Sequence, residues 1–92
     1  MTTICNGKRY DSNRTETLGT REHFFNGNYC GTTYIERASD GTLLILTESN
    51  GQSVHVTDCF YVLDEEVDFE GYDLSPTQLA RCTELGYITE VP

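Results

Sequence analysis

The sequence predicts a small α+β domain of two layers, an antiparallel meander of three to four strands packed by one C-terminal helix. Three observations predict this fold: turn dipeptides between β-prone runs, a full set of helix-boundary residues near the C-terminus, and a length of 92 residues. That length suits one domain, so we expect residues 1–92 to form a single unit. Scattered glycines in the N-terminal third predict a region rich in loops.

Two predicted hairpins define the meander. Residues 33–39 and 42–49 flank Asp40-Gly41, and Asn50-Gly51 follows the second run. Asp-Gly and Asn-Gly favour the positive φ angles of two-residue hairpin turns. We expect a fourth strand at residues 59–63. Two-residue turns would place one set of side chains on a common face, against which we expect the helix to pack: Tyr34, Ala38, Leu43, Ile45, Val54 and Val56.

The boundaries of the C-terminal helix are marked by residues with known capping preferences. Ser75 is the expected N-cap, Pro76 occupies the first helical position, and Gln78 completes a capping box. Gly86 is placed to end the helix in the left-handed conformation. The spacing predicts a buried helical stripe of Leu79, Cys82 and Leu85.

Acidic residues dominate the charge: 15 Asp and Glu against 6 Lys and Arg give a formal net charge of −9. Residues 58–92 contain one basic side chain, Arg81, and carry most of the excess. Such a surface repels free nucleic acid and anionic membranes and attracts basic protein surfaces. We therefore expect a protein partner, no membrane association, and a monomer in preference to an oligomer. The chain lacks a membrane-spanning run and a signal peptide, so the expected compartment is the cytoplasm.

The residues expected to bind a partner form two groups. The first is an acidic run interrupted by Val67, Phe69 and Tyr72, and its carboxylates are Asp64, Glu65, Glu66, Asp68, Glu70 and Asp73. It is either a contact surface for a cationic partner, to which the aromatic rings add area, or a solvated loop whose rings are tucked into the core. The second group is His23, Asn26 and Asn28, which flank Phe24-Phe25; these phenylalanines are either a contact patch or part of the core.

Neither catalysis nor metal binding is indicated by the remaining residues. The four cysteines are far apart and have no histidine near them, which favours free thiols over a zinc site or disulfides. The carboxylate spacing does not match a calcium loop. We expect no cofactor, no metal and no enzymatic activity, although a cysteine paired in space with His23 or His55 is an open alternative.

The whole string, especially NGKRYDSNRTETLGTREHFFNGNYCG and TTYIERASDGTLLILTESNG, resembles a phage-encoded type I-F anti-CRISPR protein. Its GKRYD-type opening also resembles small bacterial and phage proteins, which bears on fold alone. The first resemblance implies a non-enzymatic inhibitor of the crRNA-guided Csy surveillance complex in the cytoplasm of the infected bacterial host. Such an inhibitor prevents target DNA from hybridising to the guide. Anti-CRISPR proteins share no diagnostic motif, so no binding residue is carried over.

Two mechanisms are compatible with that resemblance. The acidic run either mimics DNA in a basic groove, or polar loops wedge against the crRNA and its backbone subunits. The alternative function is that of an acidic phage adaptor or DNA mimic that titrates another host nucleic-acid-binding protein.

Overall fold

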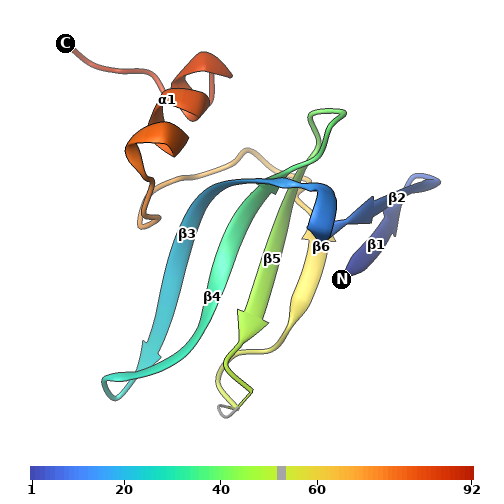
Figure 1. The fold of residues 1–92 in the computed structure, drawn as a ribbon, viewed down its shortest axis with the longest axis vertical. Coiled ribbons are helices and arrows are strands. Elements are labelled where there is room, and N and C mark those ends of the chain that lie inside the picture. Colours follow the sequence, from blue (N-terminus) through green and yellow to red (C-terminus); the bar gives the residue numbers. More distant parts are fainter. Residues whose placement is uncertain (52–53) are drawn as a thin grey trace.

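The computed structural model describes residues 1–51 and 54–92 and confirms the α+β class (Figure 1). The elements are β1 Thr2–Cys5, β2 Lys8–Asp11, the 3-10 helix η1 Ser12–Arg14, β3 Glu16–Phe25, β4 Asn28–Arg37, β5 Leu43–Ser49, β6 Cys59–Val62 and α1 Pro76–Glu84. A four-stranded antiparallel sheet has the order β3-β4-β5-β6, and β1 and β2 form a separate hairpin. The helix α1 lies beyond the β3 edge of the larger sheet and the β1–β2 hairpin beyond its β6 edge (Figure 1).

The N-terminal third consists mainly of strands, so the prediction of a loop-rich region was wrong. Asn6-Gly7 and Asn26-Gly27 both have positive φ angles, and each closes a tight hairpin. Gly19 and a register shift at Leu18 interrupt the alternation of β3, which disguises it as a loop in the sequence. The same Asn-Gly signal used for the central meander therefore also marks the two N-terminal turns.

The β4–β5 turn contains three residues instead of two, and this shifts the predicted register by one position. The Ala38 N–H donates to Thr42 O at 2.8 Å, and Gly41 has φ 88°. The turn therefore consists of residues 39–41 and ends with Gly41 in the left-handed conformation. Because side chains alternate along a strand, Ile35 now pairs with Ile45 and Tyr34 pairs with Leu46.

The sheet consequently has two faces that differ from the predicted ones. The Ile35 face carries Ile35, Leu43 and Ile45, and the Leu44 face carries Leu44, Leu46, Tyr34 and Glu36, with Ala38 in the same core cluster. The prediction that the helix covers Leu43 and Ile45 is confirmed, whereas Tyr34 and Ala38 belong to the cluster on the other side. Both faces are apolar, so both require a cover.

The strand predicted directly after Asn50-Gly51 does not form over residues 54–58, and Gln52 and Ser53 lie outside the described residues. Thr47 pairs with Cys59, so β6 occupies the position predicted for Val54, which is 92% exposed. Val56 instead packs over Gly31, where an added Cβ would lie 3.0 Å from Val56 Cγ1. The fourth strand predicted at residues 59–63 is present as β6.

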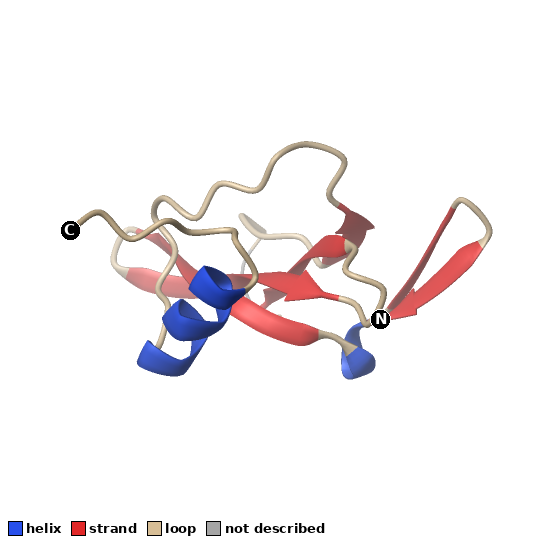
Figure 2. Ribbon diagram, turned by 90° about the horizontal axis from the view of Figure 1, so that it is seen from above, coloured by secondary structure: helices blue, strands red, loops and turns tan. Residues whose placement is uncertain are grey.

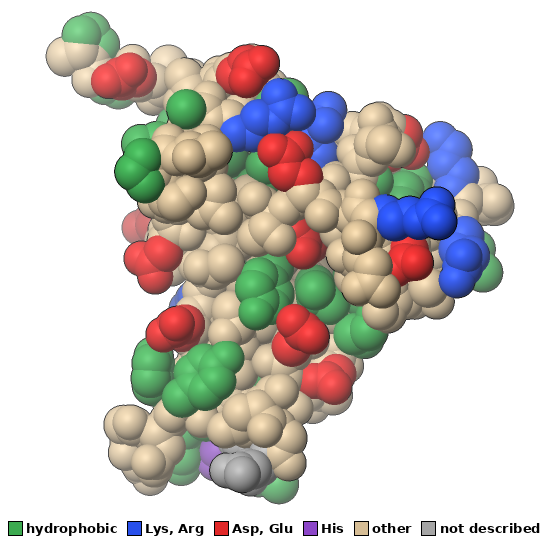
Figure 3. Space-filling view, in the orientation of Figure 1, with side chains coloured by type: hydrophobic (Ala, Val, Ile, Leu, Met, Phe, Trp, Pro, Cys, Tyr) green, Lys and Arg blue, Asp and Glu red, His purple; other side chains and the backbone are tan. Residues whose placement is uncertain are grey.

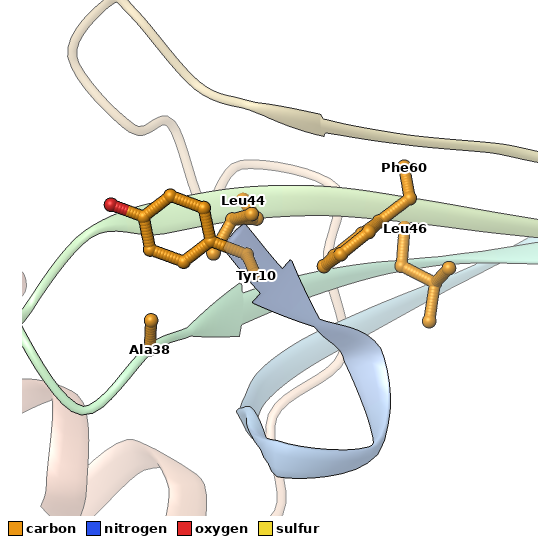
Figure 4. Close-up of a cluster of buried hydrophobic side chains, with 5 residues drawn as sticks. All are labelled: Tyr10, Ala38, Leu44, Leu46 and Phe60. Atoms are coloured by element: carbon orange, nitrogen blue, oxygen red, sulfur yellow. The ribbon is translucent and has the colours of Figure 1, made fainter. Parts of the chain in front are cut away.

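The Leu44 face is covered by the N-terminal hairpin through Tyr10 (Figure 4). The Tyr10 ring belongs to a buried cluster with Ala38, Leu44, Leu46 and Phe60. Its hydroxyl donates to Asp40 Oδ2 at 3.1 Å, and Lys8 Nζ contacts the same oxygen at 3.4 Å. Asp40 therefore ties the hairpin to the β4–β5 turn.

The Ile35 face is covered by the segment that precedes the helix, which arches over one side of the sheet (Figure 2), and by side chains of the helix region. Buried Cys82 packs with Leu18 and Ile35, and half-buried Leu85 joins them. The predicted caps are confirmed: Ser75 Oγ accepts from Gln78 N at 3.1 Å, and Gly86 has φ 83°. The prediction that Leu79 belongs to the buried stripe was wrong, because Leu79 is 49% exposed on the outer side of the short helix.

The helix and its preceding segment also cover the edge of β3. Thr20 and Asp73 exchange two backbone hydrogen bonds of 3.0 and 2.7 Å. Gln78 Nε2 donates to Thr17 O at 3.4 Å, and Cys82 Sγ donates to Leu18 O at 3.8 Å. These contacts satisfy backbone groups that an open edge would expose.

The close packing at Gly31 predicts a strong effect of a single methyl group. Gly31→Ala would place a Cβ 2.4 Å from the backbone oxygen of Glu48, and we expect the free energy of unfolding to fall by roughly 1–3 kcal/mol. In Gly19→Ala the nearest atom is the flexible side chain of Leu74 at 3.3 Å, so the loss should be smaller. Urea unfolding followed by circular dichroism measures both. Equal losses would contradict the described contact.

The environment of Asp40 predicts a pH-dependent contribution to stability. Hydrogen bonds from the Thr42 N–H and hydroxyl, then from Tyr10 and Lys8, lower the pKa of Asp40 to about 2. A lowered carboxyl pKa stabilises the fold above the unfolded pKa of about 4, and this stabilisation is lost as the pH falls through about 2. We expect Asp40→Ala to be less stable than the wild type at pH 7, and we expect this difference in the free energy of unfolding to shrink from pH 4 to pH 2. Urea unfolding midpoints across this range test the prediction. The control Glu90→Ala, in the C-terminal tail, should not differ from the wild type in this way.

Candidate functional site

The acidic run, residues 64–73, crosses the Ile35 face between β6 and α1. It leaves the sheet after β6, passes on the side opposite η1, and returns to the edge of β3 at Asp73 (Figure 2). Tyr72 N donates to Phe69 O at 3.0 Å, and Asp68 Oδ1 accepts from Glu70 N at 2.9 Å. These bonds and the Thr20–Asp73 bridge fix the path of the segment, which we call the acidic segment.

Apolar and acidic side chains of the acidic segment point in opposite directions. Val67, Phe69 and Tyr72 are half-buried and pack against the cluster of Leu18, Ile35 and Cys82. The predicted alternative in which Phe69 and Tyr72 are tucked into the core is therefore confirmed for these rings. All six carboxylates are exposed, namely Asp64, Glu65, Glu66, Asp68, Glu70 and Asp73. The rings anchor the segment, and the carboxylates form its outer surface.

A groove of about 280 Å³ separates the acidic segment from the sheet. Its acidic wall comprises Glu65, Glu66 and Asp68, and Tyr61 and Tyr72 also line it. Burial raises the pKa of Tyr72, although the nearby Arg21 charge opposes this shift. Carboxylates beside aromatic rings suit the ammonium and guanidinium groups of Lys and Arg.

Hydroxyl groups at the base of the groove form a short chain with His23. His23 Nε2 and Thr33 Oγ1 are 2.6 Å apart, and Thr33 Oγ1 lies 2.9 Å from Thr47 Oγ1. No pattern in the sequence links His23 with the acidic segment. The register of β3 against β4 makes this link, because it places His23 on the Ile35 face.

The second predicted group is divided between this groove and the tip of the β3–β4 hairpin. Asn26 and Asn28 are exposed at the turn, whereas the half-buried His23 ring bonds to Thr33. Phe24 and Phe25 are 60% and 48% exposed, so they form a surface patch and are not core residues. The Phe25 ring stacks on His55 with centroids 3.8 Å apart.

The basic side chain nearest in sequence to the acidic segment is engaged elsewhere. Arg81 Nε lies 3.0 Å from Glu16 Oε2, and Arg81 Nη1 lies 3.5 Å from Glu84 Oε2. These contacts raise the pKa of Arg81. Among the described residues, the ion pairs use no carboxylate of the acidic segment. Its negative charge is therefore available to a partner.

Glu36, a carboxylate on the Leu44 face, is only 4% exposed and was not among the predicted site residues. Burial raises its pKa, a hydrogen bond from the Thr17 hydroxyl opposes that shift, and the Glu48 charge adds to it. Strand alternation places Glu36 on the same face as Tyr34 and Ala38, which were expected to be covered. That position between two inward-facing residues is the signal in the sequence that could have identified Glu36 as buried.

All four cysteines are free; Cys30 and Cys82 are buried, whereas Cys5 and Cys59 are half-buried. Burial raises the pKa of the Cys82 thiol, which disfavours the reactive thiolate. No helix in the described part of the chain has the length and hydropathy of a membrane span. No family model matches the chain, and no curated protein or solved structure is significantly similar to it.

Buried Glu36 predicts a pH-dependent effect of Glu36→Gln. A raised pKa means that the wild type retains full stability below the unfolded pKa of Glu36, near 4.5, and loses stability as the pH rises through the folded value. Because Gln is uncharged, we expect Glu36→Gln to be more stable than the wild type at pH 7 and similar to it at pH 4. Thermal unfolding at both pH values tests this, with exposed Glu22→Gln as the control. A variant that is less stable at pH 7 would contradict it.

Proposed function

We propose that this protein is a stoichiometric inhibitor of the type I-F crRNA-guided Csy surveillance complex, which it binds in the cytoplasm of an infected bacterium. The observation that carries the proposal is the acidic segment, whose exposed carboxylates are held in place by Val67, Phe69 and Tyr72. The segment supports binding to a cationic protein surface. The identity of the target is supported by the sequence resemblance described above.

The proposed mechanism is competition for positively charged grooves. In crRNA-guided complexes, target DNA is held largely through its backbone, and base pairing with the guide reads its sequence. Carboxylates that occupy such a groove exclude phosphates from it. The formal net charge of −9 also accelerates encounter with a cationic surface, and salt screens this attraction. Inhibition then requires occupancy alone, with no chemical step and no cofactor.

The anchored aromatic rings favour a preformed binding surface over a flexible acidic tail. A flexible tail loses conformational entropy when it binds, whereas the backbone of the acidic segment is already restrained at Phe69, Tyr72 and Asp73. The groove beside it offers space for Lys or Arg side chains of the target. Both features support a contact in which the segment keeps its conformation.

A gel-shift titration tests the proposed function. Purified protein is added to the assembled type I-F complex, and binding of a target duplex is measured at two salt concentrations. We expect the DNA shift to disappear near stoichiometric protein, with relief at the higher salt concentration. If DNA binding is unchanged but DNA cleavage is blocked, the protein inhibits the later step of nuclease recruitment. No co-migration with the complex would refute the proposed target and favour an acidic adaptor that titrates another host nucleic-acid-binding protein.

Neutralising two carboxylates separates DNA mimicry from a steric wedge. We expect Glu65→Gln with Glu66→Gln to weaken binding to the complex by about tenfold, since each loses a charged contact. The matched control, Glu22→Gln with Glu90→Gln, changes the net charge equally at exposed positions outside the segment. The affinity of each variant for the complex is measured from its ability to compete with the target duplex. Retained inhibition by the first variant would contradict mimicry and support the wedge mechanism.

A further inference from the structure

A second groove, of about 270 Å³, lies on the Leu44 face, opposite the acidic segment. Glu36 and Glu48 contribute carboxylates to it, Tyr34 and Leu46 contribute ring and aliphatic surface, and Thr17 and Asn13 contribute polar groups. Figure 3 looks onto this face, where carboxylates gather beside hydrophobic side chains over the middle of the sheet. Its volume lies below that of drug-sized sites, so it suits one small group.

The main indication of a ligand is the buried carboxylate of Glu36. Glu36 is 4% exposed, and its Oε2 has no hydrogen-bond partner among the described residues. A buried carboxylate oxygen without a partner is costly, because it has lost water and gained no donor. The Thr17 hydroxyl, which lines the same groove, favours the charged form of this carboxylate. Glu36, which lines the groove, therefore has one carboxylate oxygen that the surrounding described residues leave without a donor.

The surroundings of Glu36 define the chemistry of that donor. Tyr34 and Leu46 pair across β4 and β5, two positions along the strand from the Glu36–Leu44 pair and on the same face. Glu48 lies on the same face and is close enough for its charge to act on both Tyr34 and Glu36. A tyrosine ring, an aliphatic surface and two carboxylates together suit an organic cation with an apolar stem.

We propose that this groove binds one ammonium or guanidinium head of an aliphatic cation, with Glu36 and Glu48 accepting its hydrogen bonds and Tyr34 and Leu46 packing against its stem. Lys or Arg side chains of a protein and free polyamines share this chemistry. The site is on the opposite face from the acidic segment, so it does not depend on the proposed CRISPR target.

The test is an NMR titration of the full chain with n-butylammonium chloride, using sodium chloride at equal ionic strength as the reference. We expect saturable shifts at the backbone amides of Thr17, Tyr34 and Leu46, which sodium does not reproduce. Glu36→Gln should weaken binding about tenfold, the value of one charge-assisted hydrogen bond, and exposed Glu22→Gln should leave it unchanged. Glu48→Gln, at the exposed rim, should weaken binding severalfold and provides a second variant if Glu36→Gln misfolds.

Two further probes identify the source of the cation. An N-acetyl-lysine methylamide that binds as tightly as spermidine indicates a protein side chain, whereas a clear preference for spermidine indicates a free polyamine. The proposal is overturned if the shifts are linear up to the highest concentration. It is also overturned if sodium reproduces them, or if Glu36→Gln and Glu48→Gln bind n-butylammonium as the wild type does.

Discussion

The fold depends on the three-residue turn between β4 and β5, because this turn decides which side chains share a face. With Gly41 in the left-handed conformation, Ile35 pairs with Ile45 and Tyr34 with Leu46. The hydrophobic side chains are thereby divided between two faces, and a four-stranded sheet with two apolar faces is stable only when both are covered. The N-terminal hairpin covers one face through Tyr10, and the acidic segment with the helix covers the other.

This division explains how one short segment combines two roles. The rings of Phe69 and Tyr72 complete the core on the Ile35 face, while the neighbouring carboxylates face outward. The composition of the segment suggested either a loop packed on the core or an exposed charged surface. In the structure the rings follow the first description and the carboxylates follow the second. Its apolar side chains provide the restraint that gives its charges a defined arrangement.

The sequence predicted those features that depend on local chemistry. The helix was recognised through Ser75 and Gln78 because a capping box acts within one turn. The register of β5 was missed, since Asp40-Gly41 fits both two- and three-residue turns and only tertiary packing chooses between them. The exposure of the predicted acidic residues followed from their charge. Alternation places Glu36 on the covered face with Tyr34 and Ala38, but it does not show which groups surround the carboxylate, so the groove itself was not foreseeable.

The contacts along β3 also bear on how the protein avoids self-assembly. Unpaired backbone groups of an edge strand are a template for strands of other molecules, which can lead to aggregation. Asp73 and Gln78 occupy the first half of this edge, and the remainder begins with the charged pair Arg21 and Glu22. By pairing with this edge, the segment that carries the acidic surface thus also blocks strand addition from other molecules. Substitutions that alter the charge of this segment are therefore limited to side chains that leave the Thr20–Asp73 bridge intact.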